Sequence, residues 1–275
     1  MKRRVGLHIR LVESLAAAAE KAVRLELPFF QCFFTRQDTG TLMQFTDQEI
    51  ALFLKEYREH FTELYLHGSY WINLAGIKKN GYRSFEKEIE LAKKMSFTHM
   101  VVHPGSAKGA QHKKEGIDAF AVALNKILKY EHDIQLVIEN TAHGKMTVGS
   151  DINDFKLLLE KIDHPEKLTF ALDTAHAFVY GYDMSTDIGQ DAFIQLVDDA
   201  VGLERVSLIH LNDSSKGCGS CIDKHAVLGE GLIGELALKR FATNSQLAAI
   251  PMLLELPIMA EEQEYTIVEK VRSWF

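Results

Sequence analysis

Six short apolar runs in this chain end in a side chain of a type that binds metal ions. The runs are Tyr65-Leu66-His67, Val101-Val102-His103, Val137-Ile138-Glu139, Ala171-Leu172-Asp173, Leu208-Ile209-His210 and Leu253-Leu254-Glu255. An apolar run of this length is typical of a buried strand. A charge or an imidazole buried at its end is costly unless a partner compensates for it. Six such endings indicate strands that converge on a shared metal centre.

Two further segments carry the same residue types. His176 follows the strand-end Asp173 after three residues, at the expected turn into a helix. Asp223 and His225 are two residues apart, so in an extended loop both side chains point to one side. A carboxylate oxygen and an imidazole nitrogen at that spacing suit Zn²⁺ or Mn²⁺. The candidate ligands are therefore His67, His103, Glu139, Asp173, His176, His210, Asp223, His225 and Glu255.

Each candidate also has a plain structural interpretation when it is taken alone. Asp173 could be a helix N-cap, and a single strand-end histidine is more often a hydrogen-bonded structural group. Nine separate structural explanations are less economical than one metal centre. The structural interpretation is kept for the remaining histidines: His8, His60, His99, His112, His132, His143 and His164.

The elements that must position these residues follow from a repeated pattern. The chain has 275 residues, 47% of them apolar and 25% charged, which is ordinary for a soluble globular protein. A short apolar run, a polar loop and a helical stretch recur every ~30–40 residues. The expected strands are 3–9, 29–35, 64–67, 98–103, 135–139, 168–173, 206–211 and 251–255. The expected helices are 11–25, 46–60, 83–96, 113–131, 151–161, 189–201, 234–243 and 260–272.

Eight alternating units predict an α/β fold, a single-domain (β/α)₈ TIM barrel over residues 1–275. A doubly wound open sheet is the competing architecture, but it usually places ligands at one or two crevices. Side chains from six strand ends meeting at one point favour the closed barrel. In such barrels the active site lies at the C-terminal ends of the strands, where all six runs end.

Composition excludes some classes of protein. The longest apolar stretch falls short of the ~18 residues of a membrane span, and the basic start lacks the apolar stretch of a signal peptide. The default expectation is a cytoplasmic protein without a membrane partner. The formal net charge of −7 argues against generic affinity for nucleic acid, although bound divalent ions would offset most of that charge.

The segments together resemble the endonuclease IV family of apurinic/apyrimidinic endonucleases. The similar strings, in family order, are His67-Gly68-Ser69-Tyr70, His103-Pro104-Gly105-Ser106, Ile138-Glu139-Asn140-Thr141-Ala142, Asp173-Thr174-Ala175-His176-Ala177-Phe178, His210-Leu211-Asn212-Asp213, Asp223-Lys224-His225, Leu228-Gly229-Glu230-Gly231 and Leu254-Glu255. The N-terminal third matches less well: it reads Gly6-Leu7-His8-Ile9-Arg10 where the family has a Gly-Ala-His-Val-Ser type of string.

The resemblance implies a (β/α)₈ barrel that holds three Zn²⁺ per chain and cleaves the phosphodiester on the 5′ side of an abasic site in DNA. It implies three ligand sets: His67, His103 and Glu139; Glu139, Asp173, His210 and Glu255; and His176, Asp223 and His225. Glu139 would bridge two ions, and Glu255 or Asp173 would accept or orient the proton of the attacking water. Catalytic roles are thus expected for Glu139, Glu255 and Asp173.

The expected partner is double-stranded DNA containing abasic sites, and a monomer is the default state. Tyr70 and Trp71 follow His67 directly and are the candidates for insertion beside the lesion; Arg36 is the candidate for a loop arginine that contacts DNA. Two alternatives remain open at this point. One is a sugar isomerase or epimerase on the same barrel, which would not need the third ligand set. The other is a lesion-binding protein that does not cut.

Overall fold

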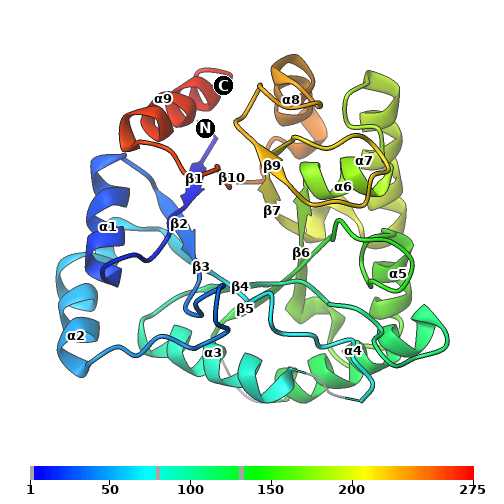
Figure 1. Ribbon diagram of the computed structural model, residues 1–275, viewed down its shortest axis with the longest axis horizontal. Helices are drawn as coiled ribbons and strands as arrows, with labels where there is room; N and C mark the ends of the chain where they lie inside the picture. Colours follow the sequence, from blue (N-terminus) through cyan, green and yellow to red (C-terminus); the bar gives the residue numbers. More distant parts are fainter. Residues whose placement is uncertain (1–2, 79–80, 130–132) are drawn as a thin grey trace.

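The computed structural model describes residues 3–78, 81–129 and 133–275, and it shows a closed barrel of eight parallel strands inside a ring of helices (Figure 1). The barrel closes because the first strand pairs with both the second and the last, with Val5 opposite Met252 and Leu7 opposite Phe30. The predicted (β/α)₈ barrel is therefore confirmed, and the open sheet is excluded.

All eight predicted strands are present. They are β1 (Val5–His8), β2 (Phe29–Cys32), β3 (Glu63–His67), β4 (His99–Val102), β5 (Gln135–Glu139), β6 (Leu168–Asp173), β7 (Val206–His210) and β10 (Met252–Leu254). Around them lie α1 (Leu15–Arg24), α2 (Asp47–Glu56), α3 (Tyr82–Lys94), α4 (Lys113–Leu128), α5 (Asn153–Leu159), α6 (Thr174–Tyr180), α7 (Asp187–Val201), α8 (Glu235–Ala242) and α9 (Glu261–Arg272). Short 3₁₀ helices occupy Arg58–His60, Pro165–Lys167, Leu203–Arg205 and Ser245–Leu247.

Several predicted element bounds were wrong. The first helix starts at Leu15 rather than residue 11, because Ser14 accepts a hydrogen bond from the Ala17 N–H and caps it. The predicted helix 46–60 ends at Glu56 and is followed by a separate 3₁₀ turn. The short helix α6 and a small antiparallel hairpin, β8 (Asp213–Ser214) with β9 (His225–Ala226), were not expected. His132 and the end of the predicted helix 113–131 lie outside the described residues.

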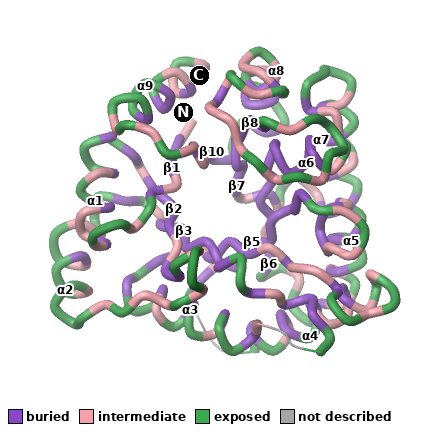
Figure 2. Tube along the Cα trace, viewed as in Figure 1, coloured by how far each residue is buried: buried purple, intermediate pink, exposed green. Residues whose placement is uncertain are grey.

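The barrel interior is built by strand periodicity. One large or apolar side chain from each of seven strands forms a separate buried cluster inside the barrel: Phe29, Tyr65, Val101, Val137, Ala171, Leu208 and Leu253. The remaining strand, β1, has Gly6 at the equivalent position. A Cβ there would lie 2.4 Å from the Phe29 ring, so glycine leaves the space that this ring fills. Figure 2 shows the strands buried and the outer surfaces of the helices exposed. Within the described residues, the helices lack the length and apolar content needed to cross a membrane.

Candidate metal centre

The functional candidates form a ring next to this interior cluster, two residues nearer the C-terminal end of each strand. Because side chains on one face of a strand repeat every second residue, the residue two positions after each cluster member also points inward. These positions, with the one two residues after Gly6, form what we call the upper ring: His8, Gln31, His67, His103, Glu139, Asp173, His210 and Glu255. The strand ends thus bring together all six strand-end candidates.

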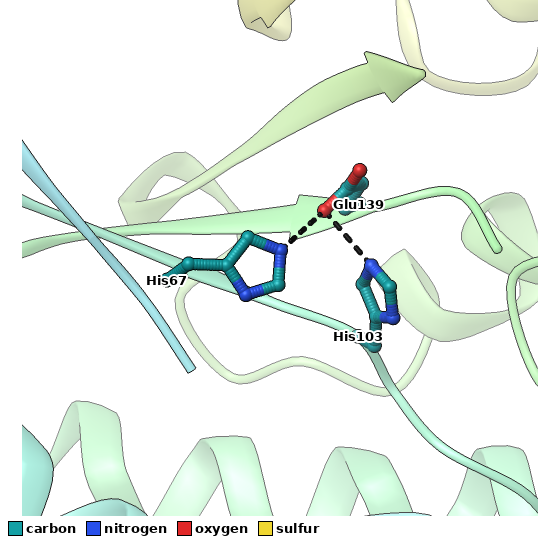
Figure 3. A group of neighbouring side chains, drawn as sticks. All are labelled: His67, His103 and Glu139. Atoms are coloured by element: carbon teal, nitrogen blue, oxygen red, sulfur yellow. Dashed lines mark hydrogen bonds and ion pairs between the residues drawn. The ribbon is translucent and has the colours of Figure 1, made fainter. Parts of the chain in front are cut away.

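The first group of possible ligands joins β3, β4 and β5. Nε2 of His67 and Nε2 of His103 each lie 3.0 Å from Oε2 of Glu139, and both imidazoles point at this one carboxylate (Figure 3). Glu139 is fully buried, and His67 is almost fully buried. One atom from each residue lies within 4.8 Å of the others, a spacing that one metal ion can span.

The second group shares Glu139 with the first. Nδ1 of His210 lies 2.8 Å from Oε1 of Glu139 and 3.9 Å from oxygens of both Asp173 and Glu255. The two oxygens of Glu139 therefore face different groups, as a carboxylate bridging two ions requires. Glu139, Asp173 and His210 each have one possible ligand atom within 4.8 Å of the other two. Glu255 lies at the edge of this cluster, with Oε2 3.9 Å from His210 Nδ1.

The third group depends on α6 and the hairpin. Asp173 ends β6 and its Oδ1 accepts a hydrogen bond from the His176 N–H, so this cap starts α6 and turns His176 toward the centre. Nε2 of His176 lies 3.2 Å from Oδ2 of Asp223, and Nε2 of His225 lies 3.3 Å from Oδ1 of the same residue. Asp173 Oδ2 is 3.8 Å from His225 Nε2. The donor atoms that all lie within 4.8 Å of one another here belong to Asp173, His176 and His225, and Asp223 adjoins them through its contacts with both histidines.

The protein fixes which nitrogen of these histidines faces the carboxylates. Nδ1 of His67, His176 and His225 lies 2.8, 2.9 and 3.2 Å from the backbone carbonyls of Gly68, Asn140 and Glu255, respectively. A carbonyl only accepts hydrogen bonds, so each Nδ1 carries a proton and each Nε2 is the nitrogen that faces a carboxylate oxygen. This pattern, in which the outer nitrogen donates to the protein, is typical of histidines that bind metal.

Electrostatics point the same way. Burial alone would raise the pKa of Glu139, but the imidazoles of His210 and His103 outweigh it and hold that pKa well below the usual value. Burial would lower the pKa of His210, but the charges of Glu139 and Glu255 raise it to about 9. Burial opposes ionisation of Asp223 as well, yet His176 and His225 lower its pKa. Ionisation of Glu139 and Asp223 in this buried centre therefore depends on positive charge close to their oxygens.

The donor set fits divalent metal ions. Among the described residues, the ion-pair partners of Glu139, Asp173, Asp223 and Glu255 are all histidines, and no lysine or arginine compensates for the four carboxylates. Buried carboxylates cost several kcal/mol each unless they are paired or coordinate a metal. Nε2 of His225 is also buried without an aligned hydrogen bond. Mixed imidazole and carboxylate donors of this kind suit Zn²⁺.

Four polar residues around the centre were missed by the sequence reasoning. Asn212 donates to Asp173 Oδ2 at 2.6 Å and accepts from the Glu255 N–H at 2.8 Å, and Asn140 accepts from the Asp173 N–H at 2.7 Å. Gln31 and His8 belong to the upper ring. His8 was expected to have a purely structural role, but its Nδ1 lies 3.3 Å from Glu255 Oε1. The two-residue period from Phe29 and Gly6 is the signal that could have found Gln31 and His8.

The three candidates for DNA contact occupy different places on the rim. The Tyr70 ring lies beside the centre, with its centroid 5.7 Å from that of His67 and 5.6 Å from that of His103. Trp71 turns away: its Nε1 donates to the Gln37 carbonyl at 3.0 Å, and its side chain is largely exposed. Arg36 is exposed on the neighbouring loop.

Two cavities open on either side of Tyr70. The larger, about 800 Å³, is lined by His8, Arg36, Tyr70, His225 and Glu255 together with apolar residues of the first and last loops. The smaller, about 370 Å³, is lined by Tyr70, His103, His176 and Asp223. Both cavities reach the metal-type groups, so a substrate lying across the rim would meet Tyr70 at its middle.

The fold places this protein in a broad class of TIM-barrel proteins. Residues 19–275 match the model of the xylose isomerase-like TIM barrel family, and the chain belongs to it. A solved structure described as a D-tagatose 3-epimerase-like protein has the same fold, with a TM-score of 0.74, but is only 16% identical over 98% of this chain and 96% of its own.

More similar proteins narrow the class. The chain is 33% identical to a protein of Halorhodospira halophila named "Probable endonuclease 4", over 92% of this chain and 88% of that protein. It is 30% identical to the crystal structure of endonuclease IV from Thermus thermophilus, over 98% of both chains, with a TM-score of 0.82. The chain therefore belongs to the endonuclease IV family, as its sequence motifs predicted.

Proposed function

We propose that this protein is a zinc-dependent apurinic/apyrimidinic endonuclease of DNA repair. It would hydrolyse the phosphodiester 5′ to an abasic site and leave a 3′-hydroxyl and a 5′-deoxyribose phosphate. The observation that carries the proposal is the convergence of nine imidazole and carboxylate groups: seven form three clusters that share Glu139 and Asp173, and Asp223 and Glu255 adjoin them. The similarity to proteins named endonuclease 4 supports the same class of reaction.

Bound zinc would neutralise the phosphodiester, supply hydroxide near pH 7 and stabilise the leaving oxygen. The residues that would hold it are His67, His103 and Glu139 for one ion; Glu139, Asp173, His210 and Glu255 for the second; and His176, Asp223 and His225 for the third. Glu139 is suited to the shared position because its two oxygens face separate groups. No serine, cysteine or lysine nucleophile is required.

Glu255 is better placed than Asp173 to accept the proton of the attacking water. Both oxygens of Asp173 accept short hydrogen bonds, from the His176 N–H at 2.7 Å and from Asn212 at 2.6 Å, and the side chain is fully buried. Glu255 lines the larger cavity, and among the described residues its Oε2 accepts one longer hydrogen bond, from Asn212 at 3.3 Å. Water entering from the cavity therefore meets Glu255 first.

Substrate choice would come from the rim. An abasic nucleotide lacks a stacked base, so extruding it from the duplex costs less than extruding an intact nucleotide. Tyr70, between the two cavities, is placed to occupy the vacated space, and Arg36 on the next loop is placed to meet the phosphate backbone. Trp71 lies farther out and would contact the flanking duplex.

The test is incubation of the zinc-loaded protein with a labelled duplex that contains one abasic site, followed by analysis of the product ends. The proposal expects a single nick 5′ to the site, a 3′-hydroxyl that a polymerase extends, and loss of nicking after strong chelation. Tight binding without a nick would indicate a lesion-binding protein. An inert duplex together with turnover of a ketose would indicate an isomerase or epimerase.

A further inference from the structure

Gln31 is a fully buried polar side chain inside the barrel, on β2, and none of the three proposed ligand sets includes it. It lies in the upper ring between two proposed ligands. Its Nε2 is 2.7 Å from Glu255 Oε1 and 2.9 Å from His8 Nδ1, and its Oε1 is 3.1 Å from His210 Nε2. All three polar groups around the amide are side chains of the same ring.

These contacts fix the orientation of the Gln31 amide and identify the nitrogen of His210 that donates to it. The Glu255 carboxylate can only accept, so the amide NH₂ of Gln31 must face it. The amide oxygen then faces His210, which must donate from Nε2. In the neutral imidazole that could bind a metal ion, Nδ1 of His210 then carries the lone pair, and it faces Glu139 Oε1 at 2.8 Å. Because a lone pair and a carboxylate oxygen repel each other at this distance, a proton or a metal ion must lie between these two atoms.

We infer that Gln31 is a positioning residue that orients two ligands of the second set, His210 and Glu255, toward a metal ion. It holds the proton of His210 on the outer nitrogen, and it occupies Glu255 Oε1 so that Oε2 is the oxygen turned toward His210 Nδ1, 3.9 Å away. The inference rests on the proposed function, since it concerns the same centre. An amide suits this place because it donates to one ligand and accepts from the other.

The experiment compares Gln31→Met with Gln190→Met. Gln190 is an equally buried glutamine whose Nε2 donates to the Met184 and Ala237 carbonyls, both at 2.8 Å, away from the centre. Both variants lose one buried amide and keep the length of the side chain. Each protein is equilibrated with zinc against a chelator of known affinity, and bound zinc per chain is measured. Visible absorption of the cobalt-substituted proteins reports the geometry of the bound ions.

We expect Gln31→Met to bind one of three ions ~10–100-fold more weakly than the wild type, with an altered cobalt spectrum. Gln190→Met should bind all three normally. Gln31→Glu, which keeps the shape but sets a carboxylate against Glu255, should show the same selective weakening and serves if Gln31→Met does not fold. If both Gln31 variants bind all three zinc ions with wild-type affinity, the inference is wrong but the proposed function still stands. A wild-type chain that binds no zinc would overturn the proposed function and the inference together.

Discussion

The two ends of the barrel interior are both polar, but they solve the problem of buried charge differently. At the lower end, Arg4 forms an ion pair with Glu63, and His99 stacks on Tyr65 with centroids 4.5 Å apart. Arg4, Glu63 and His99 are half-buried, Tyr65 is buried, and the charges of Arg4 and Glu63 compensate for each other. At the upper end, the ion-pair partners of the four carboxylates are, among the described residues, all histidines, and the outer nitrogens of these histidines donate to the protein. A self-compensating end is typical of a structural role, and an uncompensated end is typical of a site for ions.

The largest expected contrast between the two ends is in catalysis. Glu139→Gln removes the shared carboxylate of the upper ring and should lower the rate of abasic-site cleavage on the order of 1,000-fold, equivalent to ~4 kcal/mol of transition-state stabilisation. Glu63→Gln is the matched change at the lower end and should leave the rate within about threefold. Rates at saturating zinc measure both. Equal losses in the two variants would remove the functional distinction between the ends.

Acid should weaken the lower end through His99. Burial, aided by the charge of Arg4, lowers the pKa of His99 from 6.5 to about 4. The folded state thus prefers neutral imidazole, and the stabilisation is fully present above pH 6.5 and is lost as the pH falls toward 4. The contribution is at most ~3 kcal/mol. Urea unfolding of wild type and His99→Phe between pH 4 and 7 checks this, and parallel pH profiles would refute it.

The layer between the two ends should be sensitive to added volume. The Cβ of Gly6→Ala would lie 2.4 Å from the Phe29 ring, so the barrel must shift to accept it. We expect a loss of ~1–3 kcal/mol in unfolding free energy. Gly217→Ala is the control, because a Cβ there meets nothing within 4 Å. Denaturant unfolding compares the two, and a stability of Gly6→Ala equal to the control would show that the interior is not tightly filled.

The smallest effect is expected at the outer rim of the upper end. Trp71 is 63% exposed, so Trp71→Ala should leave folding unchanged. Loss of its contact with the flanking duplex should raise the Kd for abasic DNA roughly three- to tenfold, or ~1 kcal/mol. Tyr265→Ala removes an exposed aromatic ring from α9 and serves as the control. Fluorescence anisotropy with a labelled duplex measures the difference, and equal Kd values would remove Trp71 from the DNA-contacting surface.

The contrast between the ends also explains what the sequence could predict. Strand ends that combine an apolar run with one acid or histidine are visible by inspection, and they predicted β3 to β7, β10 and the six candidate ligands that these strands position. Gln31 and His8 were missed because Gln31 stands within the apolar run Phe29-Phe30-Gln31-Cys32 and His8 was assigned a structural role. Their place depends on barrel closure, which aligns β1 and β2 with the other six strands.

The secondary-structure elements that the sequence did not predict were the short ones. The hairpin of β8 and β9 has two residues in each strand, too few to show periodicity, although it delivers His225 to the centre. Helix α6 is seven residues long and is started by Asp173, a residue that also faces the possible ions. Asp173 thus has two roles, as the N-cap of α6 and as a candidate ligand. From the sequence these roles were treated as alternatives, so the helix that the cap starts was not predicted.

Zinc titration of the metal-stripped protein, with bound zinc and abasic-site nicking measured on the same samples, tests the central claim most directly. The nine upper-end groups predict that nicking is absent without metal, rises with bound zinc and reaches its maximum near three ions per chain. Full nicking by the stripped protein, or no nicking at three ions per chain, would contradict the account of the upper end as a hydrolytic metal centre.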